Sequence, residues 1–274
     1  MAQAMGFYTD TTVCIGCKAC QVACHQWNGL PAELAEQPTT TRPGKVLPLT
    51  GNSYDNTGSF SDVNWRHVKF IEQGTRADRS DLAWLMMSDV CKHCVNAPCL
   101  EVCPTGAIIR TEFDSVYIQQ SACNGCRDCV AACPFGVIHM GGRENGGQGT
   151  AKKCTLCYDR LQNGLQPACS TACPTESIQF GPIDELKARA QKRLGVVKAA
   201  GHSKAQLYGA DEKILGGLNS FYLLADVPET YGLPPNPKLP SRSVRPSSLF
   251  SMASAVLMGL AALVAFRERG RRES

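Results

Sequence analysis

Hydrophobic positions along the chain predict one amphipathic helix and a few short strands. Apolar residues recur at steps of three and four with Lys and Arg between them, which describes a helix with one apolar face: Ile183, Leu186, Ala190, Leu194 and Val197. Gly201 is the predicted stop of this helix. Short apolar runs at Val116–Ile118 and Phe221–Ala225 predict strands. Six prolines between Pro228 and Pro246 predict an extended tether, so residues 183–245 form a helix, a strand and a Pro-rich tether.

An uncharged segment of twenty-one residues follows, from Pro246 to Phe266, bounded by Arg245 and Arg267. It is long enough to cross a bilayer once, whereas a buried core helix is usually shorter. Small residues four apart line one face of it, where another transmembrane helix could approach: Ser251, Ala255 and Gly259. We predict a transmembrane helix over residues 246–266 and a basic tail over residues 267–274.

Residues 37–90 have the pattern of an insertion. A Gly, Asn and Ser-rich stretch at 51–61 precedes two strand-like runs, Asn64–Glu72 and Leu82–Met87. We interpret this segment as a surface loop plus a hairpin. Trp65 and Trp84 are expected to pack within the hairpin rather than to contact a cofactor.

Cysteine is the residue that departs most from ordinary usage, with sixteen copies in 274 residues. The chain is too long for a small secreted disulfide scaffold. All the cysteines fall into four groups of four: Cys14, Cys17, Cys20 and Cys24; Cys91, Cys94, Cys99 and Cys103; Cys123, Cys126, Cys129 and Cys133; Cys154, Cys157, Cys169 and Cys173.

The spacing within these groups is that of iron-sulfur ligands. Groups one and three read C-x2-C-x2-C-x3-C, group two widens the middle gap to four residues, and group four widens it to eleven. In two-cluster ferredoxins of this pattern, three cysteines of a run bind one cluster and the fourth binds the other. Sixteen ligands therefore predict four [4Fe-4S] clusters in two reciprocal pairs. Proline follows the last cysteine of groups two, three and four, as in that pattern, and His25 takes this place in group one.

Two other uses of cysteine compete with this interpretation. Structural zinc sites use pairs of C-x2-C knuckles a dozen or more residues apart, and group four alone fits that description. Sixteen cysteines also allow eight disulfides by parity, although cysteines three apart in one loop rarely satisfy disulfide geometry with each other.

A repeat accompanies the cysteines. The sequences CPTGAI, CPFGVI and CPTESI begin at Cys103, Cys133 and Cys173, and they indicate copies of one ferredoxin half-module in which a cysteine loop leads into a short helix and a strand. The predicted fold is α+β with small sheets and much loop. Nineteen residues separate groups two and three, and twenty separate groups three and four, so spacing leaves open which group pairs with group three.

Composition narrows the function classes. The net charge is +4 and no basic stripe with interleaved aromatics is present, which argues against nucleic-acid binding. No Ser-His-Asp arrangement, phosphate-binding loop or Rossmann fingerprint appears, so we expect no catalytic site on this chain. Four residues near the cysteine loops either raise cluster potentials or are ordinary solvated charges: Lys18, Lys92, Arg127 and Lys153. His93 is expected to act as a dipole beside a cluster rather than as a ligand.

Four segments carry a resemblance to a known family. They are CIGCKACQVAC at Cys14–Cys24, KHCVNAPCLEVCPTGAI at Lys92–Ile108, KCTLCYDR at Lys153–Arg160 and YGLPPNPK at Tyr231–Lys238. Together they closely resemble the beta, iron-sulfur subunit of membrane-bound respiratory formate dehydrogenase, within the dimethyl sulfoxide reductase iron-sulfur subunit group. The likeness runs from residue 8 to about 266, and the segment Gln37–Ser61 departs from it.

The resemblance implies a pairing of the cysteine groups. Groups one and four would share a ferredoxin-like domain of residues 1–36 and 150–182, and groups two and three would share one of residues 91–149. In similar proteins each cluster takes three cysteines of one group and the last of its partner group. The implied sets are Cys14, Cys17, Cys20 with Cys173; Cys154, Cys157, Cys169 with Cys24; Cys91, Cys94, Cys99 with Cys133; and Cys123, Cys126, Cys129 with Cys103.

The resemblance also implies a role and partners. Electrons from formate oxidation at a molybdopterin or tungstopterin in a catalytic alpha subunit would pass through four clusters to a membrane cytochrome b gamma subunit and then to quinone. Four arginines after residue 266 favour a cytoplasmic C-terminus, so the cluster domain would face the periplasm. The N-terminus shows no signal peptide or twin-arginine pair, and similar proteins are exported on the alpha subunit's signal.

Two alternatives remain open at this point. The same electron wire could serve another respiratory complex, such as a dimethyl sulfoxide or polysulfide reductase or a hydrogenase. A membrane-tethered iron-sulfur redox sensor without partners is a hypothesis from a different class, and the small-residue face of the tail helix argues against it.

Overall fold

The computed structural model describes residues 3–31, 34–36, 45–46, 54–55, 57–75, 78–142 and 149–272. The chain divides into two compact units, residues 1–237 and 238–274. The strands are β1 (Met5–Asp10), β2 (Leu34–Glu36), β3 (Lys45–Val46), β4 (Arg66–Thr75), β5 (Asp78–Val90), β6 (Ile108–Arg110), β7 (Val116–Ile118), β8 (His139–Met140), β9 (Ala151–Lys152), β10 (Ile178–Pro182), β11 (Gln206–Tyr208) and β12 (Ser220–Leu224). The helices are α1 (Ala19–Trp27), α2 (Pro98–Glu101), α3 (Asp128–Ala132), α4 (Tyr158–Gln162), α5 (Ala168–Thr171), α6 (Ile183–Ala199) and α7 (Pro240–Arg272), with 3-10 turns η1 (Thr11–Val13), η2 (Gln120–Ala122) and η4 (Pro228–Tyr231).

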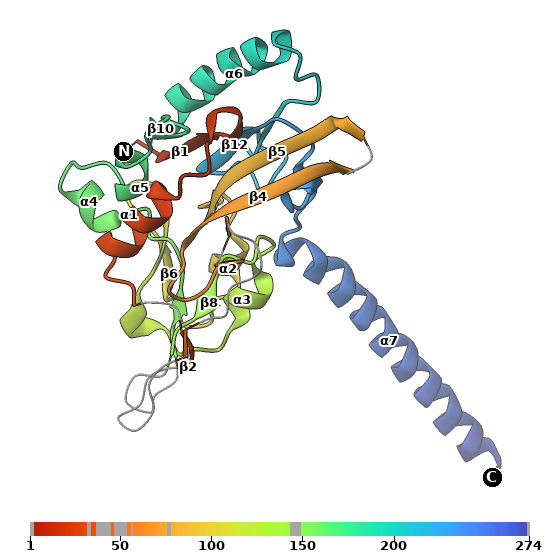
Figure 1. The fold of residues 1–274 in the computed structure, drawn as a ribbon. Helices are drawn as coiled ribbons and strands as arrows, with labels where there is room; N and C mark the ends of the chain where they lie inside the picture. The colour runs from red at the N-terminus through yellow and green to blue at the C-terminus, as the bar shows by residue number, and fades with distance from the viewer. Residues whose placement is uncertain are drawn as a thin grey trace. The chain divides into compact units, whose positions relative to one another are not determined.

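The largest sheet has four strands in the order β10-β1-β12-β11. β1 runs antiparallel to β10 and parallel to β12, and all five residues of β12 are buried. The predicted strand Phe221–Ala225 is therefore a central strand of this sheet. The predicted helix with one apolar face is α6, which packs on β1 and β10 through Ile183, Leu186 and Ala190 (Figure 1). The sheet joins the first strand of the chain to strands from its C-terminal half.

Each cysteine group follows the predicted module, in which a loop leads into a short helix. The loops enter α1, α2, α3, α4 and α5. Strand pairs β6–β7 and β8–β9 connect groups two, three and four, and β7 is the predicted strand Val116–Ile118. The α+β fold class with small sheets is confirmed.

The two strand-like runs of the insertion form the predicted hairpin, β4 and β5, whose antiparallel register pairs Arg66 with Val90 (Figure 1). Trp84 packs against Tyr54 and Phe70, as expected. The Trp65 indole donates to the backbone oxygen of Asp62, in the loop that precedes β4. The hairpin is more than a surface feature, because its paired ends are buried at Arg66–Val68 and Met87–Val90. Most of the departing segment 37–61 lies outside the described residues.

The proline-rich segment differs from the predicted extended tether. η4 covers Pro228–Tyr231, and Tyr231 and Leu233 are almost fully buried. The Tyr231 hydroxyl accepts a hydrogen bond from the Ala225 N–H, and the Tyr231 carbonyl oxygen accepts one from Lys69. Packing of two large apolar side chains among the prolines holds this segment against the rest of the first unit.

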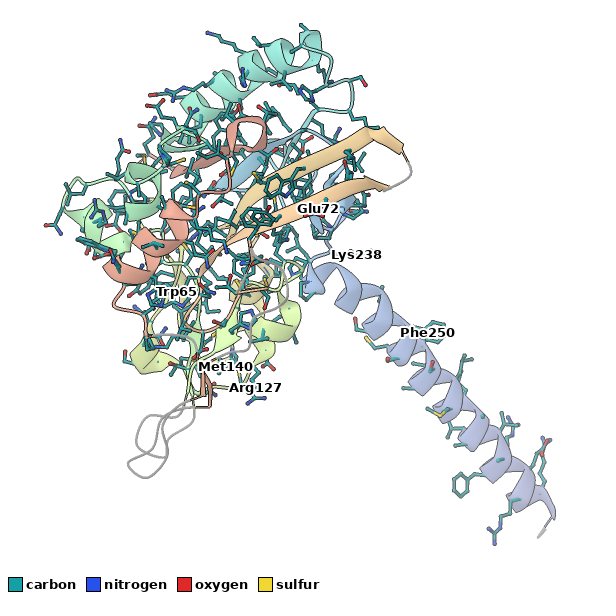
Figure 2. All side chains as sticks on the ribbon, viewed as in Figure 1. Trp65, Glu72, Arg127, Met140, Lys238 and Phe250 are labelled. Atoms are coloured by element: carbon teal, nitrogen blue, oxygen red, sulfur yellow. The ribbon has the colours of Figure 1, made fainter. Side chains whose placement is uncertain are left out.

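The second unit is the helix α7. It begins at Pro240, six residues before the predicted boundary at 246, because proline is well tolerated in the first turn of a helix. Within it, Ser248–Arg269 is the candidate membrane span among the described residues, 22 residues long. At 1.5 Å per residue it rises about 33 Å, enough for a bilayer core. Its side chains, Phe250 among them, project outward from the helix (Figure 2).

Candidate functional site

All sixteen cysteines lie in the described part of the chain and all are free, so the disulfide alternative is wrong. Nine are buried and five are partly exposed. Only Cys17 and Cys126 are exposed. These unpaired thiols are therefore available as metal ligands.

Three small cavities are each lined by four cysteines from two groups. We name them by their place in the chain. The first set is Cys14, Cys17, Cys20 and Cys173; the second is Cys91, Cys94, Cys99 and Cys133; the third is Cys103, Cys123, Cys126 and Cys129. In each, three cysteines of one run meet the last cysteine of another.

The remaining four cysteines form the fourth set: Cys24, Cys154, Cys157 and Cys169. The charges that act most on the Cys24 thiol, after burial, include those of Cys154, Cys169 and Cys157. α1, which carries Cys24, packs against α5, which carries Cys169. These four thiols therefore gather in one region.

Left-handed backbone turns shape the cysteine loops. Gly16 and Lys18 have φ of 65° and 61°, and Gly125 and Arg127 occupy the same places in group three with φ of 75° and 73°. Glycine adopts this region at little cost. At Gly16 a side chain is also excluded, because a Cβ would lie 2.5 Å from a ring carbon of Phe70 on the hairpin. The hairpin thus closes against the group-one loop.

Burial sets the protonation of the thiols. It raises the pKa of Cys20 and Cys157 to about 11, and that of Cys99 and Cys154 to about 12. At neutral pH these groups keep their protons unless a metal cation replaces them. Metal ligation by such thiols releases protons, so ligand binding is coupled to pH.

The donor sets fit [4Fe-4S] clusters. Each cavity offers four sulfur donors and no carboxylate, and the other lining residues are largely apolar, such as Val68 and Ile178 in the first and Val137 and Ile138 in the second. Arg127 and Met140, both labelled in Figure 2, also line the third cavity. Thiolate donors in an apolar shell are what iron-sulfur clusters use.

The four cations singled out from the sequence have different surroundings. Lys92 and Lys153 are buried, so the solvated alternative is wrong for both. Lys153 donates to the backbone oxygens of Val116 and Cys154. Lys18 is partly exposed and lies 4.0 Å from Asp55 and 5.4 Å from the centre of the Phe70 ring. Arg127 is exposed.

Lys92 is part of a buried charge network. Its ammonium pairs with Asp89, which also pairs with Lys69 at 2.9 Å, and it donates to the Tyr222 hydroxyl at 3.0 Å. Burial raises the pKa of Asp89, but Lys92 and Lys69 together hold it well below its usual range. The charge of Lys92 is therefore compensated by a carboxylate of the protein.

His93 lies against the second cavity. Its Nδ1 accepts the Val116 N–H at 3.1 Å, so the proton is assigned to Nε2, which is buried and has no hydrogen-bond partner. Burial, followed by the charges of Lys153, Arg110 and Arg66, lowers the pKa of His93 well below its usual value. A neutral imidazole with its free N–H beside four cysteines matches the predicted dipole.

Electrostatic interactions between sets place them in series. The Cys99 thiol of the second set interacts with Cys129 of the third. Cys154 of the fourth set interacts with Cys91 of the second, and Cys20 of the first interacts with Cys169 of the fourth. These pairwise interactions favour the order third, second, fourth and first. The exposed cysteines, Cys126 and Cys17, belong to the two terminal sets.

The hairpin contributes residues that sequence reasoning missed. Arg66 is buried beside Cys20 and the fourth set, and Ser88 Oγ lies 3.2 Å from Cys20 Sγ. Both residues lie far along the chain from the cysteines that they face. Along the sequence, the only local sign of this role was a charged residue at the buried end of a strand.

Comparisons with known proteins agree with the site. Residues 13–107 and 82–183 each match a 4Fe-4S dicluster domain family. The formate dehydrogenase iron-sulfur subunit of Haemophilus influenzae is 36% identical over 93% of this chain and 76% of its own length. The nitrate-inducible formate dehydrogenase iron-sulfur subunit of Escherichia coli is 38% identical over 84% and 72%. The formate dehydrogenase subunit beta of Megalodesulfovibrio gigas is 32% identical over 82% and 96%.

These relatives are iron-sulfur subunits of oxidoreductases by name, and the dicluster matches span all four cysteine groups. The cysteine-lined cavities offer the sulfur donors that such clusters use. The chain therefore belongs to the family of formate dehydrogenase iron-sulfur subunits, and it is a non-catalytic electron-transfer subunit that carries [4Fe-4S] clusters.

Proposed function

We propose that this chain holds four [4Fe-4S] clusters, one in each cysteine set, and relays electrons along them within a membrane-bound formate dehydrogenase. The observation that carries the count is the grouping of the sixteen cysteines: three quartets line separate cavities and the fourth quartet gathers beside α1 and α5. The reciprocal exchange of last cysteines supports two ferredoxin-like domains, residues 1–36 with 150–182 and residues 91–149.

The protein's own part in this function is to bind the clusters, to set the distances between them and to shield them from water. A [4Fe-4S] cluster supplies one-electron transfer when bound. The buried thiols keep the interior sets away from water. The small cysteine loops keep neighbouring sets near enough to interact electrostatically, as Cys129 does with the Cys99 thiol. The series of sets gives electrons a continuous path. Its ends are at Cys126 and Cys17, where exposure allows an outside donor or acceptor to approach.

The proposed partners are a catalytic subunit and a membrane subunit. Likeness to formate dehydrogenase subunits over most of both chains supports a molybdopterin or tungstopterin alpha subunit as the electron source. The candidate span of α7 supports a membrane location and a cytochrome b-type gamma subunit that passes electrons to quinone. Arginines at 267, 269, 271 and 272 favour a cytoplasmic C-terminus, with the clusters outside.

A second candidate function is electron transfer through the same clusters in a complex whose catalytic subunit acts on another substrate. The thiosulfate reductase electron transfer subunit of Salmonella typhi is 38% identical, and a subunit of the anaerobic dimethyl sulfoxide reductase of Escherichia coli is 31% identical. These cover 64% and 68% of the present sequence, less than the formate dehydrogenase subunits do. The shorter coverage favours formate.

The test is anaerobic purification of the intact complex from solubilised membranes. Iron and sulfide are quantified and formate-dependent dye reduction is assayed on the same sample. We expect about sixteen irons on this chain and reduction of the dye by formate. The same iron with reduction coupled to thiosulfate or dimethyl sulfoxide instead would assign the wire to the second candidate. About eight irons would refute the count.

The pairing has its own test. Cys24→Ser is expected to alter the cluster signal of the fourth set more than that of the first, because Cys24 belongs to a set with Cys154, Cys157 and Cys169. The measurement is electron paramagnetic resonance of the reduced complex, with Cys17→Ser as the matched variant in the first set. An effect of Cys24→Ser confined to the first-set signal would overturn the pairing.

A further inference from the structure

Arg66 is the largest fully buried side chain that the structure describes, with 1% of its surface exposed. It begins β4 and lies opposite Val90 in the hairpin register. Arginine is rarely buried without a partner because its charge loses hydration. The groups around the Arg66 side chain therefore indicate its role.

Few of the hydrogen-bond donors of the Arg66 guanidinium have partners within the protein. Its Nη1 donates to Ser88 Oγ at 2.9 Å, and its guanidinium carbon lies 5.0 Å from the centre of the Phe7 ring. Nε and Nη2 are buried and have no hydrogen-bond partner. No carboxylate among the described residues forms an ion pair with it. A cation with unused donors in this position is costly unless an anion is supplied.

The groups that act most on its charge are cysteines of two different sets. Burial lowers the pKa of Arg66, and the thiolate forms of Cys169, Cys20, Cys154 and Cys24 more than offset this and raise it. Cys20 belongs to the first set, and the other three belong to the fourth. Ser88 Oγ is also 3.2 Å from Cys20 Sγ, so the same hydroxyl contacts Arg66 and a first-set sulfur.

Other buried cations near the sets have protein partners. Lys92 pairs with Asp89, and Lys153 donates to two backbone oxygens. Arg66 differs from both because, among the described residues, the anions around it are the cluster ligands. Its unused N–H groups and its charge are both available to whatever those thiols bind.

We propose that Arg66 is a positioning and tuning residue that lies between the first and fourth sets, donates its free N–H groups to sulfur atoms of the clusters held there, and raises both reduction potentials. The proposal rests on the proposed function, since it needs clusters at these two sets. Hydrogen bonds and positive charge both favour the reduced, more negative form of a cluster. One side chain would thereby keep two adjacent steps of the path close in potential.

The first test is potentiometric titration, monitored by electron paramagnetic resonance, on the intact complex. Arg66→Met removes the charge and the donors but keeps an unbranched apolar side chain. We expect two of the cluster signals to shift to lower potential, each by at least tenfold in the reduction equilibrium, or about 59 mV for one electron. Arg66→Lys keeps the charge, so we expect smaller shifts in the same two signals.

The control is Arg189→Met. Arg189 lies on the exposed face of α6 and donates to Gln179, away from the cysteine loops, so all signals should keep their potentials. Full iron content with unchanged potentials in Arg66→Met would overturn the proposal. Failure to find four clusters in the unsubstituted complex would refute the proposed function instead, so the two failures are distinguishable.

A second measurement does not depend on the variant folding. In complex labelled with ¹⁵N-arginine, pulsed electron paramagnetic resonance is expected to show weak ¹⁵N couplings on the first-set and fourth-set signals. These couplings should disappear in Arg66→Lys. Absence of ¹⁵N coupling from both signals in the unsubstituted complex would overturn the proposal even if Arg66→Met fails to assemble.

Discussion

Arg66 and Lys92 are two buried cations that the same hairpin region places beside cysteine sets, and they are neutralised in opposite ways. Lys92 has Asp89, with Lys69 and Tyr222 completing the network. Arg66 has a hydroxyl, an aromatic ring and four cysteines. The protein provides the counter-charge of Lys92 with a carboxylate. The counter-charge of Arg66 must come from the cysteine sets and the clusters that they bind.

The difference has a physical consequence. Asp89 offsets the charge of Lys92 in part, because it also pairs with Lys69, and Lys92 holds β5 to β12 through Asp89 and Tyr222. An unpaired guanidinium leaves a full charge in a medium of low polarity, where it acts strongly on neighbouring groups. The two residues should therefore respond differently to substitution, Lys92 in stability and Arg66 in potential.

The greatest change is expected when the series is interrupted at its middle. Cys154→Ser removes a thiol from the fourth set, and we expect loss of about four irons and interruption of electron transfer between the ends. Cys126→Ser, at an exposed terminal set, should leave the interior signals intact. Iron analysis and electron paramagnetic resonance of the two variants make the comparison. Loss of clearly more than about four irons from either variant would mean that the sets do not bind independently.

Lys92→Met should lower the stability of the complex more than it changes the reduction potentials of the clusters. Removal of Lys92 leaves Asp89 buried with Lys69 as its remaining cation. Breaking a buried pair costs roughly 3–5 kcal/mol when the partner is left uncompensated, and we expect a smaller cost here because Lys69 stays paired with Asp89. We expect a lower melting temperature of the intact complex, measured by calorimetry. The double variant Lys92→Met with Asp89→Asn should recover most of the loss, because it removes both charges. A double variant as unstable as the single one would show that the ion pair is not the cause.

Ser88→Ala tests the surroundings of Arg66 with a smaller change. It removes the hydroxyl that contacts both Arg66 Nη1 and Cys20 Sγ, at a cost of about 1 kcal/mol in unfolding free energy. We expect a shift to lower potential confined to the first-set signal. Ser59→Ala, a serine on the partly exposed loop before the hairpin, is the matched control. A shift of all signals would indicate a general structural change.

Truncation after Pro237 is expected to affect the clusters least. The remaining residues form the compact unit that holds every cysteine, so iron content should not change. The truncated chain should be released from membranes when it is expressed without partner subunits, because the candidate span is gone. Fractionation and iron analysis check both points. Retention on membranes at high salt would mean that another contact anchors the chain.

Much of the fold and site could be predicted because the signals were local. Four cysteine groups with short gaps predicted the ligand loops, the three-and-four periodicity predicted α6, and the uncharged run predicted the candidate span. Each signal concerns residues within one or two turns of each other, where spacing alone decides which side chains share a face. The uncharged run marked the span and not the whole helix, because α7 begins before Arg242 and Arg245, at Pro240, and continues through Pro246.

Spacing along the chain was enough to establish the cofactor class and the approximate location of its ligands, since thiolate spacing within a loop matches the size of the cluster. The order of the four sets and the place of Arg66 between two of them came from the folded chain alone. Those relations join Cys91 to Cys154 and Arg66 to Cys169, pairs far apart in the chain. Charge acts through distance in space, and no pattern along the chain records that distance.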